Sequence, residues 1–237
     1  MSSMMKGLAG AVALGWGLAA SAAVISVDSV SGVWTSTLGG TNVNGVGTSE
    51  VRWGTGTSGG GFQQSGLLFD GFAPPAFNVN VGDVFDLGAL THFNFPIASG
   101  TSAAGANLAL TVGLTVDGVA QSGVFSYQFL IEETPNVTPC PGFQQTGTPC
   151  DDRITFINLI GADSFVIDGE LYTISLQGFL VNDALVDEFI TEENKASRAI
   201  LKASITSRTI DVPEPGTLAL LGLGLIGLGA RRMAKRS

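Results

Sequence analysis

Charged side chains are scarce in this sequence, and basic ones are the scarcest. Only 13% of the 237 residues are charged, and 11 Lys and Arg stand against 20 Asp and Glu. Residues 24–211 hold six of those bases and 19 of those acids. Proteins that bind nucleic acids or anionic lipid surfaces need a basic footprint. The composition therefore argues against nucleic acid as a partner and against lipid docking by this segment.

Residues typical of catalytic and metal centres are also few. His92 is the only histidine, and Cys140 and Cys150 are the only cysteines. The cysteines lack the spacing of a metal or redox pair and have no further Cys or His near them. We therefore predict that the protein is not an enzyme and has no catalytic residues, cofactor or metal ligands. A secreted hydrolase is the remote alternative.

The N-terminus has the three parts of a secretory signal. Lys6 supplies the positive charge, residues 7–20 are an apolar run, and the small residues 21–23 follow. This order predicts a signal peptide over residues 1–23, removed by signal peptidase before Val24. The apolar run has 14 residues, which is short for a helix that must cross about 30 Å of hydrocarbon.

The C-terminus is the most informative stretch. Two prolines end regular structure near residue 213, so residues 207–216 are predicted to be a linker. Residues 217–230 are apolar and would span about 21 Å as a helix, which suits a transient inner-membrane association better than a permanent anchor. A basic cluster then stops transfer and stays cytoplasmic. It consists of Arg231, Arg232, Lys235 and Arg236.

This tripartite tail, with residues 217–237 as its hydrophobic helix and basic end, closely resembles the PEP-CTERM sorting signal of Gram-negative bacteria. The resemblance implies that an exosortase recognises Pro213, Glu214 and Pro215. It also implies a final place in the cell envelope, at the surface or in the extracellular matrix, because such proteins usually occur beside exopolysaccharide and biofilm genes.

The segment between the two ends alternates with period two. Apolar residues occupy every second position of 108–116, the pair Asp117-Gly118 follows, and residues 124–131 alternate again. This pattern predicts a β-hairpin. Segment 183–195 fits a helix or a hairpin, and we favour the hairpin. Many short strands predict an all-β fold, an antiparallel β-sandwich of the jelly-roll type over residues 24–206. Further strands are expected at 153–159, 164–167, 171–181 and 199–206.

The two cysteines lie in a segment rich in proline and glycine. In an exported chain they meet an oxidising compartment. We therefore predict a Cys140–Cys150 disulfide, which on the chain-entropy model contributes roughly 2.5–3 kcal/mol.

His92 and Asn94 are predicted to share one face of a strand over residues 91–97, with Phe93 on the opposite face toward the core. Pro96 means that this strand lies at an edge or ends there. Three interpretations remain open. The pair clamps a crossing loop through buried hydrogen bonds, which we favour, or it binds a ligand or ion, or His92 takes part in catalysis.

These residues also carry a second resemblance, to the THxN family of PEP-CTERM proteins, which spans much of residues 30–100. The family is defined by a Thr-His-x-Asn motif, here Thr91, His92 and Asn94. Its role is not established, so the resemblance brings no catalytic residues. The accompanying positions are Trp34, Gly39-Gly40, Val51-Arg52-Trp53-Gly54 and Asp86-Leu87-Gly88.

Three acidic pairs fall at predicted loops, namely Glu132-Glu133, Asp151-Asp152 and Glu192-Glu193. Solvated turns are the favoured interpretation, and calcium remains open as a ligand because it takes carboxylate oxygens at such places. We expect an exported structural or adhesive protein of the exopolysaccharide or biofilm. The alternative is a carbohydrate- or calcium-binding module, in which Trp34, Trp53 and the aromatic residues of 62–77 stack on sugars.

Overall fold

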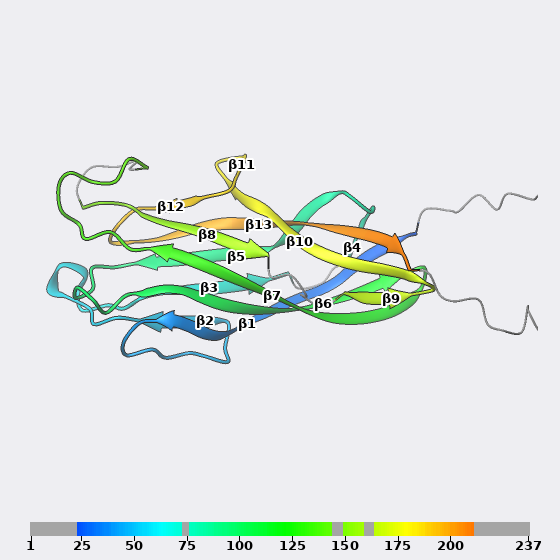
Figure 1. Cartoon of the computed structure of the whole chain (residues 1–237), viewed down its shortest axis with the longest axis horizontal. Helices are drawn as coiled ribbons and strands as arrows, with labels where there is room; N and C mark the ends of the chain where they lie inside the picture. Colours follow the sequence, from blue (N-terminus) through cyan, green and yellow to red (C-terminus); the bar gives the residue numbers. More distant parts are fainter. Residues whose placement is uncertain (1–22, 73–75, 144–148, 159–163, 211–237) are drawn as a thin grey trace, which may run out of the picture.

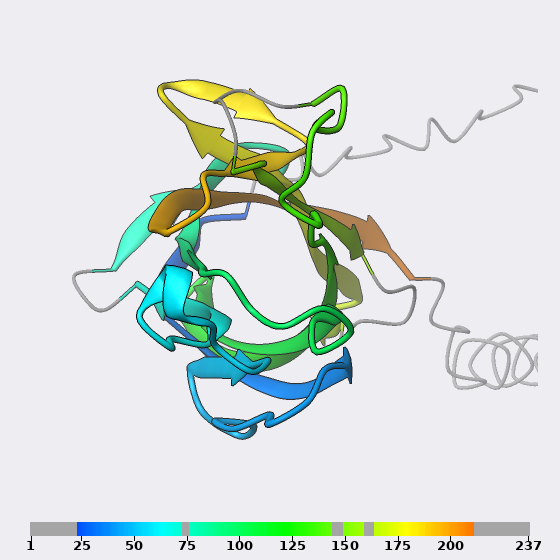
Figure 2. The same cartoon turned by 90° about the vertical axis from the view of Figure 1, so that its left-hand side faces the viewer.

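The computed structural model describes residues 23–72, 76–143, 149–158 and 164–210. In this part of the chain two curled antiparallel sheets enclose one core (Figures 1 and 2). The predicted all-β antiparallel sandwich is therefore confirmed. The predicted signal helix, the hydrophobic C-terminal helix and the sorting residues lie outside the described residues. Within the described ranges, no helix has the length and apolar character needed to cross a bilayer.

The first sheet has the order β12-β8-β7-β6-β1-β4. Its middle is a meander of three long strands followed along the chain, and β1 joins the meander from the N-terminus. The strands are β1 (Ile25–Gly39), β4 (Phe77–Val79), β6 (Ala103–Val116), β7 (Val119–Glu132), β8 (Asp152–Asn158) and β12 (Phe189–Thr191).

The second sheet has the order β11-β10-β13-β5-β3-β2, with β9 paired to β10. The end-on view of Figure 2 shows both sheets curling toward each other around the core. The strands are β2 (Glu50–Trp53), β3 (Ser65–Gly71), β5 (Val84–Asn94), β9 (Phe165–Ile167), β10 (Glu170–Val181), β11 (Ala184–Val186) and β13 (Lys195–Thr209).

The predicted hairpin at residues 108–131 is confirmed by β6 and β7. Asp117 and Gly118 form its two-residue turn with φ of 48° and 81°, the positive values that a tight hairpin turn requires. Val116 is opposite Val119 in the register. Alternate residues then point into the core, where Tyr127 also donates a hydrogen bond from its hydroxyl to the Ile174 carbonyl of the other sheet at 3.0 Å.

The segment 183–195 is extended, as favoured, but its predicted hairpin is wrong. β11 pairs with β10, whereas β12 pairs with β8 in the other sheet. The chain crosses between the sheets within this segment, and β12 then leads through a short turn into β13. β13 itself continues to Thr209, into the segment 207–216 that the sequence assigns to a linker.

The predicted orientation of the strand around His92 is also wrong. His92 and Asn94 face the core and are fully buried, and Phe93 points outward. Phe93 is accommodated there because the Arg52 guanidinium lies 3.4 Å above its ring. β5 is not an edge strand either, since it lies between β13 and β3, but it does end before Pro96 as expected.

Different strand starts and strand ends lie at the two ends of the sandwich. The start of β1 pairs with the end of β6, and the end of β13 pairs with the start of β10. The start of β1 and the end of β13 lie at the same end of the sandwich. The ends of β5, β7 and β12 and the start of β8 lie at the opposite end (Figure 1). We call this second end the loop end. β7 has 14 residues, so the ends are about 45 Å apart.

Candidate functional site

His92 and Asn94 tie the two sheets together at the loop end. Nδ1 of His92 lies 2.8 Å from Oγ1 of Thr191, and the Asn94 side-chain amide donates to the Thr191 carbonyl at 3.0 Å. Thr191 belongs to β12 of the first sheet, and β5 belongs to the second. The geometry is that of a buried clamp, the interpretation that the sequence favoured. Thr91, the first motif residue, is half-buried on the outer face of β5.

His92 is neutral in this environment. Burial, together with the positive charge of Arg52, lowers its pKa from 6.5 to about 3. The ring stacks on Trp53 with 6.4 Å between ring centroids, and its Nε2 has no hydrogen-bond partner among the described residues. Since the side chain is 0% exposed, it does not meet solvent.

A formal Gly-x-Ser-x-Gly sequence surrounds Ser58. In α/β-hydrolases that pattern places the serine on a sharp turn between a strand and a helix. Here Ser58 opens the short 3-10 turn η1 (Ser58–Gly60) in a glycine-rich loop. His92 contacts Thr191, so no serine–histidine pair is formed around Ser58 within the described residues.

Next to the clamp, three carboxylates meet at the loop end. Glu133 follows the end of β7, Asp152 begins β8, and Glu193 follows the end of β12. These three strands are neighbours in the first sheet, and that adjacency brings the side chains together. One carboxylate oxygen from each residue lies within 4.8 Å of the others. We call Glu133, Asp152 and Glu193 the acidic cluster.

Neutral donors hold one oxygen of each carboxylate. Oε2 of Glu133 accepts from the Ser102 hydroxyl at 3.2 Å. Oδ1 of Asp152 accepts from the Thr134 backbone N–H at 2.8 Å. Oε2 of Glu193 accepts from the Asn136 side-chain amide at 3.0 Å.

The remaining oxygens of two cluster members have no partner. Oδ2 of Asp152 and Oε1 of Glu193 are buried and make no hydrogen bond within the described structure. No Lys or Arg of the described residues forms an ion pair with the acidic cluster. Asp152 is 0% and Glu193 6% exposed, so both acids are removed from water without a compensating positive charge.

Burial and mutual repulsion change the titration of the acidic cluster. Burial and the charge of Glu133 raise the pKa of Asp152 from 3.8 to about 9. Burial and the charge of Glu193 raise the pKa of Glu133 from 4.5 to about 7. Burial likewise raises the pKa of Glu193. Near neutral pH the three groups therefore compete for protons, because the buried site disfavours three negative charges.

Cys150 makes hydrogen bonds to residues that hold the acidic cluster. Cys140 and Cys150 form a disulfide. The backbone N–H of Cys150 donates to Oδ1 of Asn136 at 2.9 Å, and the amide of that same Asn136 holds Glu193. The Thr134 hydroxyl donates to the Cys150 carbonyl at 3.1 Å. Cys150 thus contacts both Asn136 and Thr134, the donors to two of the three carboxylates.

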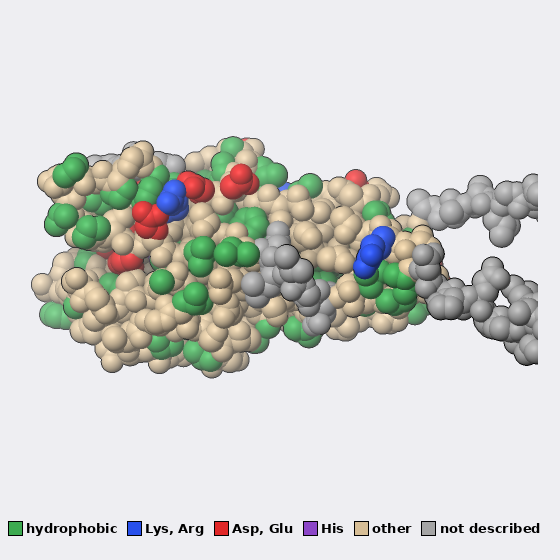
Figure 3. Space-filling view, viewed as in Figure 1, with side chains coloured by type: hydrophobic (Ala, Val, Ile, Leu, Met, Phe, Trp, Pro, Cys, Tyr) green, Lys and Arg blue, Asp and Glu red, His purple; other side chains and the backbone are tan. Residues whose placement is uncertain are grey.

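In two of the acidic pairs the first residue forms a surface ion pair and the second belongs to the acidic cluster. Glu132 forms an ion pair with Arg153, and Glu192 with Lys195, at the surface. The prediction of solvated turns is correct for these two residues. It is wrong for Asp151, Asp152 and Glu193, which are buried, and for Glu133, which is half-buried. On the face drawn in Figure 3, most charged side chains lie in the half that carries the end of β7 and the start of β8.

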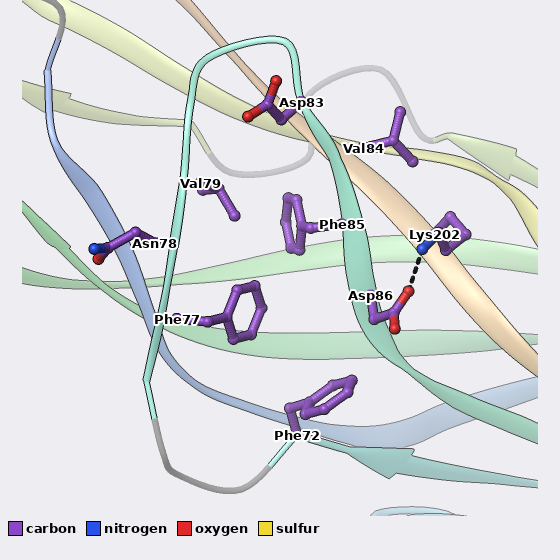
Figure 4. Close-up of a pocket in the computed structure, with 9 residues that line it drawn as sticks. All are labelled: Phe72, Phe77, Asn78, Val79, Asp83, Val84, Phe85, Asp86 and Lys202. Atoms are coloured by element: carbon purple, nitrogen blue, oxygen red, sulfur yellow. Dashed lines mark hydrogen bonds and ion pairs between the residues drawn. The ribbon is translucent and has the colours of Figure 1, made fainter.

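A second feature is a mostly apolar pocket of about 410 Å³ between β4, β5 and β13. Figure 4 shows the rings of Phe72, Phe77 and Phe85 pointing toward one another at its base. An Asp86–Lys202 ion pair lies at its rim. Trp34 and Trp53 take no part, because both are fully buried in the core. The sugar-stacking surface that the sequence suggested for these two tryptophans is therefore wrong.

Comparison with known families adds the class of protein. The chain is an exported protein that is sorted through the membrane by an exosortase. The signal itself is the PEP-CTERM protein-sorting motif, which matches residues 211–233. The match includes Pro213, Glu214 and Pro215 but not the segment of the Thr-His-x-Asn residues, so membership of the THxN family stays a prediction. The chain matches no curated protein.

Sequence reasoning missed the partners of both sites. Nothing in the sequence marks Thr191 as the partner of the motif, or Ser102 and Asn136 as donors to the acidic cluster. One signal was available for the cluster itself. Each of its members is the second residue of an acidic pair that lies next to a predicted strand. Acidic pairs beside several strands indicate that their carboxylates can meet if those strands are neighbours in one sheet.

Proposed function

We propose that the protein acts outside the cell as a structural or adhesive component of the envelope or exopolysaccharide matrix. The sorting motif at residues 211–233 carries this proposal, because it gives the route by which the chain leaves the cell. The long sandwich supports it. The sorting motif follows β13 in the chain, and β13 ends about 45 Å from the loop end.

The residues with chemical potential also support a non-enzymatic role. His92 is buried within the clamp and does not meet solvent. The acidic cluster is buried too, with only Glu133 partly exposed. The pocket between β4, β5 and β13 is mostly apolar and carries an Asp86–Lys202 ion pair at its rim. These features suit binding and stability better than turnover of a substrate.

The sorting step is tested in the cells that make the protein. Deleting residues 213–237 should move the protein from its normal place to another fraction, because the exosortase then has no motif to recognise. A second variant replaces only Pro213, Glu214 and Pro215 by alanine and keeps the apolar run and the basic cluster. It should accumulate at the inner membrane. Unchanged display of both variants at the surface would refute the sorting step.

The adhesive role is tested with the exported protein and the exopolysaccharide of its own host. Co-sedimentation should be saturable, and it is measured both in CaCl2 and in a chelator. Absence of binding in either condition would refute adhesion to the polysaccharide and leave a passive scaffold.

Carbohydrate binding at the apolar pocket is the second candidate function. The aromatic base of the pocket favours it, since Phe72 is 39% exposed and packs against Phe77 with 5.9 Å between ring centroids. Aromatic faces of this kind stack on sugar rings. Phe72→Ala should then reduce co-sedimentation, whereas Phe62→Ala, which alters a 74% exposed ring outside the pocket, should not. Equal binding by both variants would exclude the pocket.

A further inference from the structure

We propose that Glu133, Asp152 and Glu193 form a calcium-binding site at the loop end of the sandwich. The inference goes beyond the proposed function and does not depend on it. It rests on the arrangement of the three carboxylates, on two buried oxygens without partners, and on the absence of a balancing base among the described residues.

The spacing of the oxygens suits a calcium ion. Calcium binds oxygen at about 2.3–2.6 Å, so two ligands on opposite sides of one ion lie about 5 Å apart. The cluster oxygens lie within 4.8 Å of one another, so a small rotation of the side chains is enough for one ion to reach all three. Magnesium binds at about 2.0–2.1 Å and demands a near-octahedral shell, so it would have to draw the carboxylates closer.

The hydrogen bonds leave one carboxylate oxygen free on each of two cluster residues. Asp152 and Glu193 each use one oxygen to accept from Thr134 or Asn136 and keep the second oxygen buried without a partner. A buried carboxylate oxygen without a hydrogen bond or a positive neighbour is costly. A divalent cation supplies that missing partner for both oxygens, while the neutral donors keep the carboxylates oriented, as outer-shell groups do at metal sites.

The negative charge of the acidic cluster also favours a divalent cation. Three carboxylates bring up to three negative charges into one buried site, and the ion pairs of the neighbouring Arg153 and Lys195 are with Glu132, Glu188 and Glu192 instead. Without a cation, only protons bound by the carboxylates themselves would neutralise the acidic cluster, because no Lys or Arg of the described residues pairs with it. At neutral pH a divalent cation neutralises the carboxylates without requiring proton uptake.

The coordination shell has room for water on one side. Calcium takes about six to eight oxygens, and three carboxylates supply three to six of them. Glu133 is only half-buried, so solvent completes the shell from the side of this residue. A site made by loop carboxylates in an exported protein is expected to bind in the range of about 10⁻⁴–10⁻³ M, as extracellular calcium modules do.

Calcium binding is measured on the purified exported protein after treatment with EGTA. Titration with CaCl2 in a calorimeter should show one saturable site per chain at the acidic cluster. The melting temperature should rise by about 3–10 °C at 10 mM CaCl2, from the linkage between binding and stability, and by much less in MgCl2 of equal ionic strength. Absence of saturable binding overturns the proposal whatever the variants do.

Matched variants locate the site. Asp152→Asn and Glu193→Gln are isosteric changes that should abolish the calcium-dependent rise in melting temperature. Glu132→Gln and Glu192→Gln change the adjacent exposed acids and should leave the rise intact. Near-ultraviolet circular dichroism verifies that each variant is folded. A rise that survives in both cluster variants would place calcium elsewhere and overturn the proposal, with no bearing on sorting or on polysaccharide binding.

Discussion

Replacing an ionisable member of the acidic cluster by a neutral residue should stabilise the metal-free protein. We expect the Asp152→Asn variant, in the presence of EGTA at pH 8, to unfold at a higher urea concentration than the unmodified protein. The asparagine keeps the carbonyl oxygen that accepts from the Thr134 N–H. Its amide also offers a donor to the neighbouring carboxylates, so the change removes the ionisable group without removing the local hydrogen bond.

The size of this gain follows from the titration of Asp152. Its pKa is about 9 in the folded protein against an ordinary 3.8. Below pH ~4 both folded and unfolded chains hold the proton, so the charge costs nothing. Between pH ~4 and ~9 the unfolded chain releases a proton that the folded chain retains, and stability falls as pH rises. At roughly 1.4 kcal/mol per pH unit this reaches at most about 6 kcal/mol near pH 8.

Coulombic repulsion gives a similar magnitude. Two unit charges 4.8 Å apart repel by about 3 kcal/mol at an effective dielectric constant of ~20. Because Glu133 and Glu193 share the same protons with Asp152, the two estimates describe one effect and are not added. We therefore expect a gain of about 3–5 kcal/mol at pH 8 and less than half of that at pH 5.

Urea unfolding followed by tryptophan fluorescence measures the gain, since Trp34 and Trp53 are buried in the core. The unmodified protein and Asp152→Asn are compared in EGTA at pH 5 and pH 8, and again in 10 mM CaCl2. Calcium should stabilise the unmodified protein and leave the stability of the variant unchanged. The stability difference between the two proteins should therefore become smaller or change sign in CaCl2. An Asp152→Asn protein that is less stable than the unmodified one in EGTA at both pH values would refute the electrostatic reasoning.

The clamp and the disulfide give three further expectations. Asn94→Ala should lower the free energy of unfolding by about 2 kcal/mol, because it leaves the buried Thr191 carbonyl without its donor. Urea unfolding measures this change, and Asn78→Ala, which alters an exposed residue, is the control. The pKa of His92 is lowered from 6.5 to about 3, so the free energy of unfolding falls as pH drops from ~6.5 to ~3 and the unfolded chain takes up a proton at this residue. In the His92→Gln variant this part of the pH dependence of the free energy of unfolding should be absent. Reducing the Cys140–Cys150 disulfide should raise the calcium concentration for half-saturation in calorimetry, and an unchanged value would mean that the loop does not orient the carboxylates.

Local patterns in the sequence predict much of the sandwich. Strict alternation over residues 108–116 and the Asp117-Gly118 pair define β6, β7 and their turn, because strand faces and tight turns depend on adjacent residues alone. The orientation of β5 is different. Aromatic and polar residues alternate in Thr91-His92-Phe93-Asn94, so either face can be buried. The choice depends on Arg52 covering Phe93 and on Thr191 pairing with His92, and both partners are distant in sequence.

The acidic cluster lies beyond local prediction for a related reason. Glu133, Asp152 and Glu193 come together only because β8 pairs with β7 on one side and with β12 on the other. A loop rich in acidic residues reads as solvated when its neighbours are unknown. The order of strands turns three separate loops into one buried site, and no property of any single loop contains that information.

The Thr-His-x-Asn residues and the acidic cluster are parts of one structural unit. Thr191 accepts the Asn94 amide at its carbonyl and contacts His92 through its hydroxyl, which also lies 3.4 Å from the Asp152 carbonyl. The clamp therefore fixes β12 against the second sheet, and the same strand pairs Thr191 with Asp152 and ends two residues before Glu193. A strand held on both sides in this way presents Glu193 to Asp152 in one position. The motif residues thus position Glu193 relative to Asp152 and do not themselves contact the proposed ion. A substitution that removes the hydrogen bonds of His92 or Asn94 to Thr191 should therefore weaken calcium binding, although it changes none of the proposed ligands.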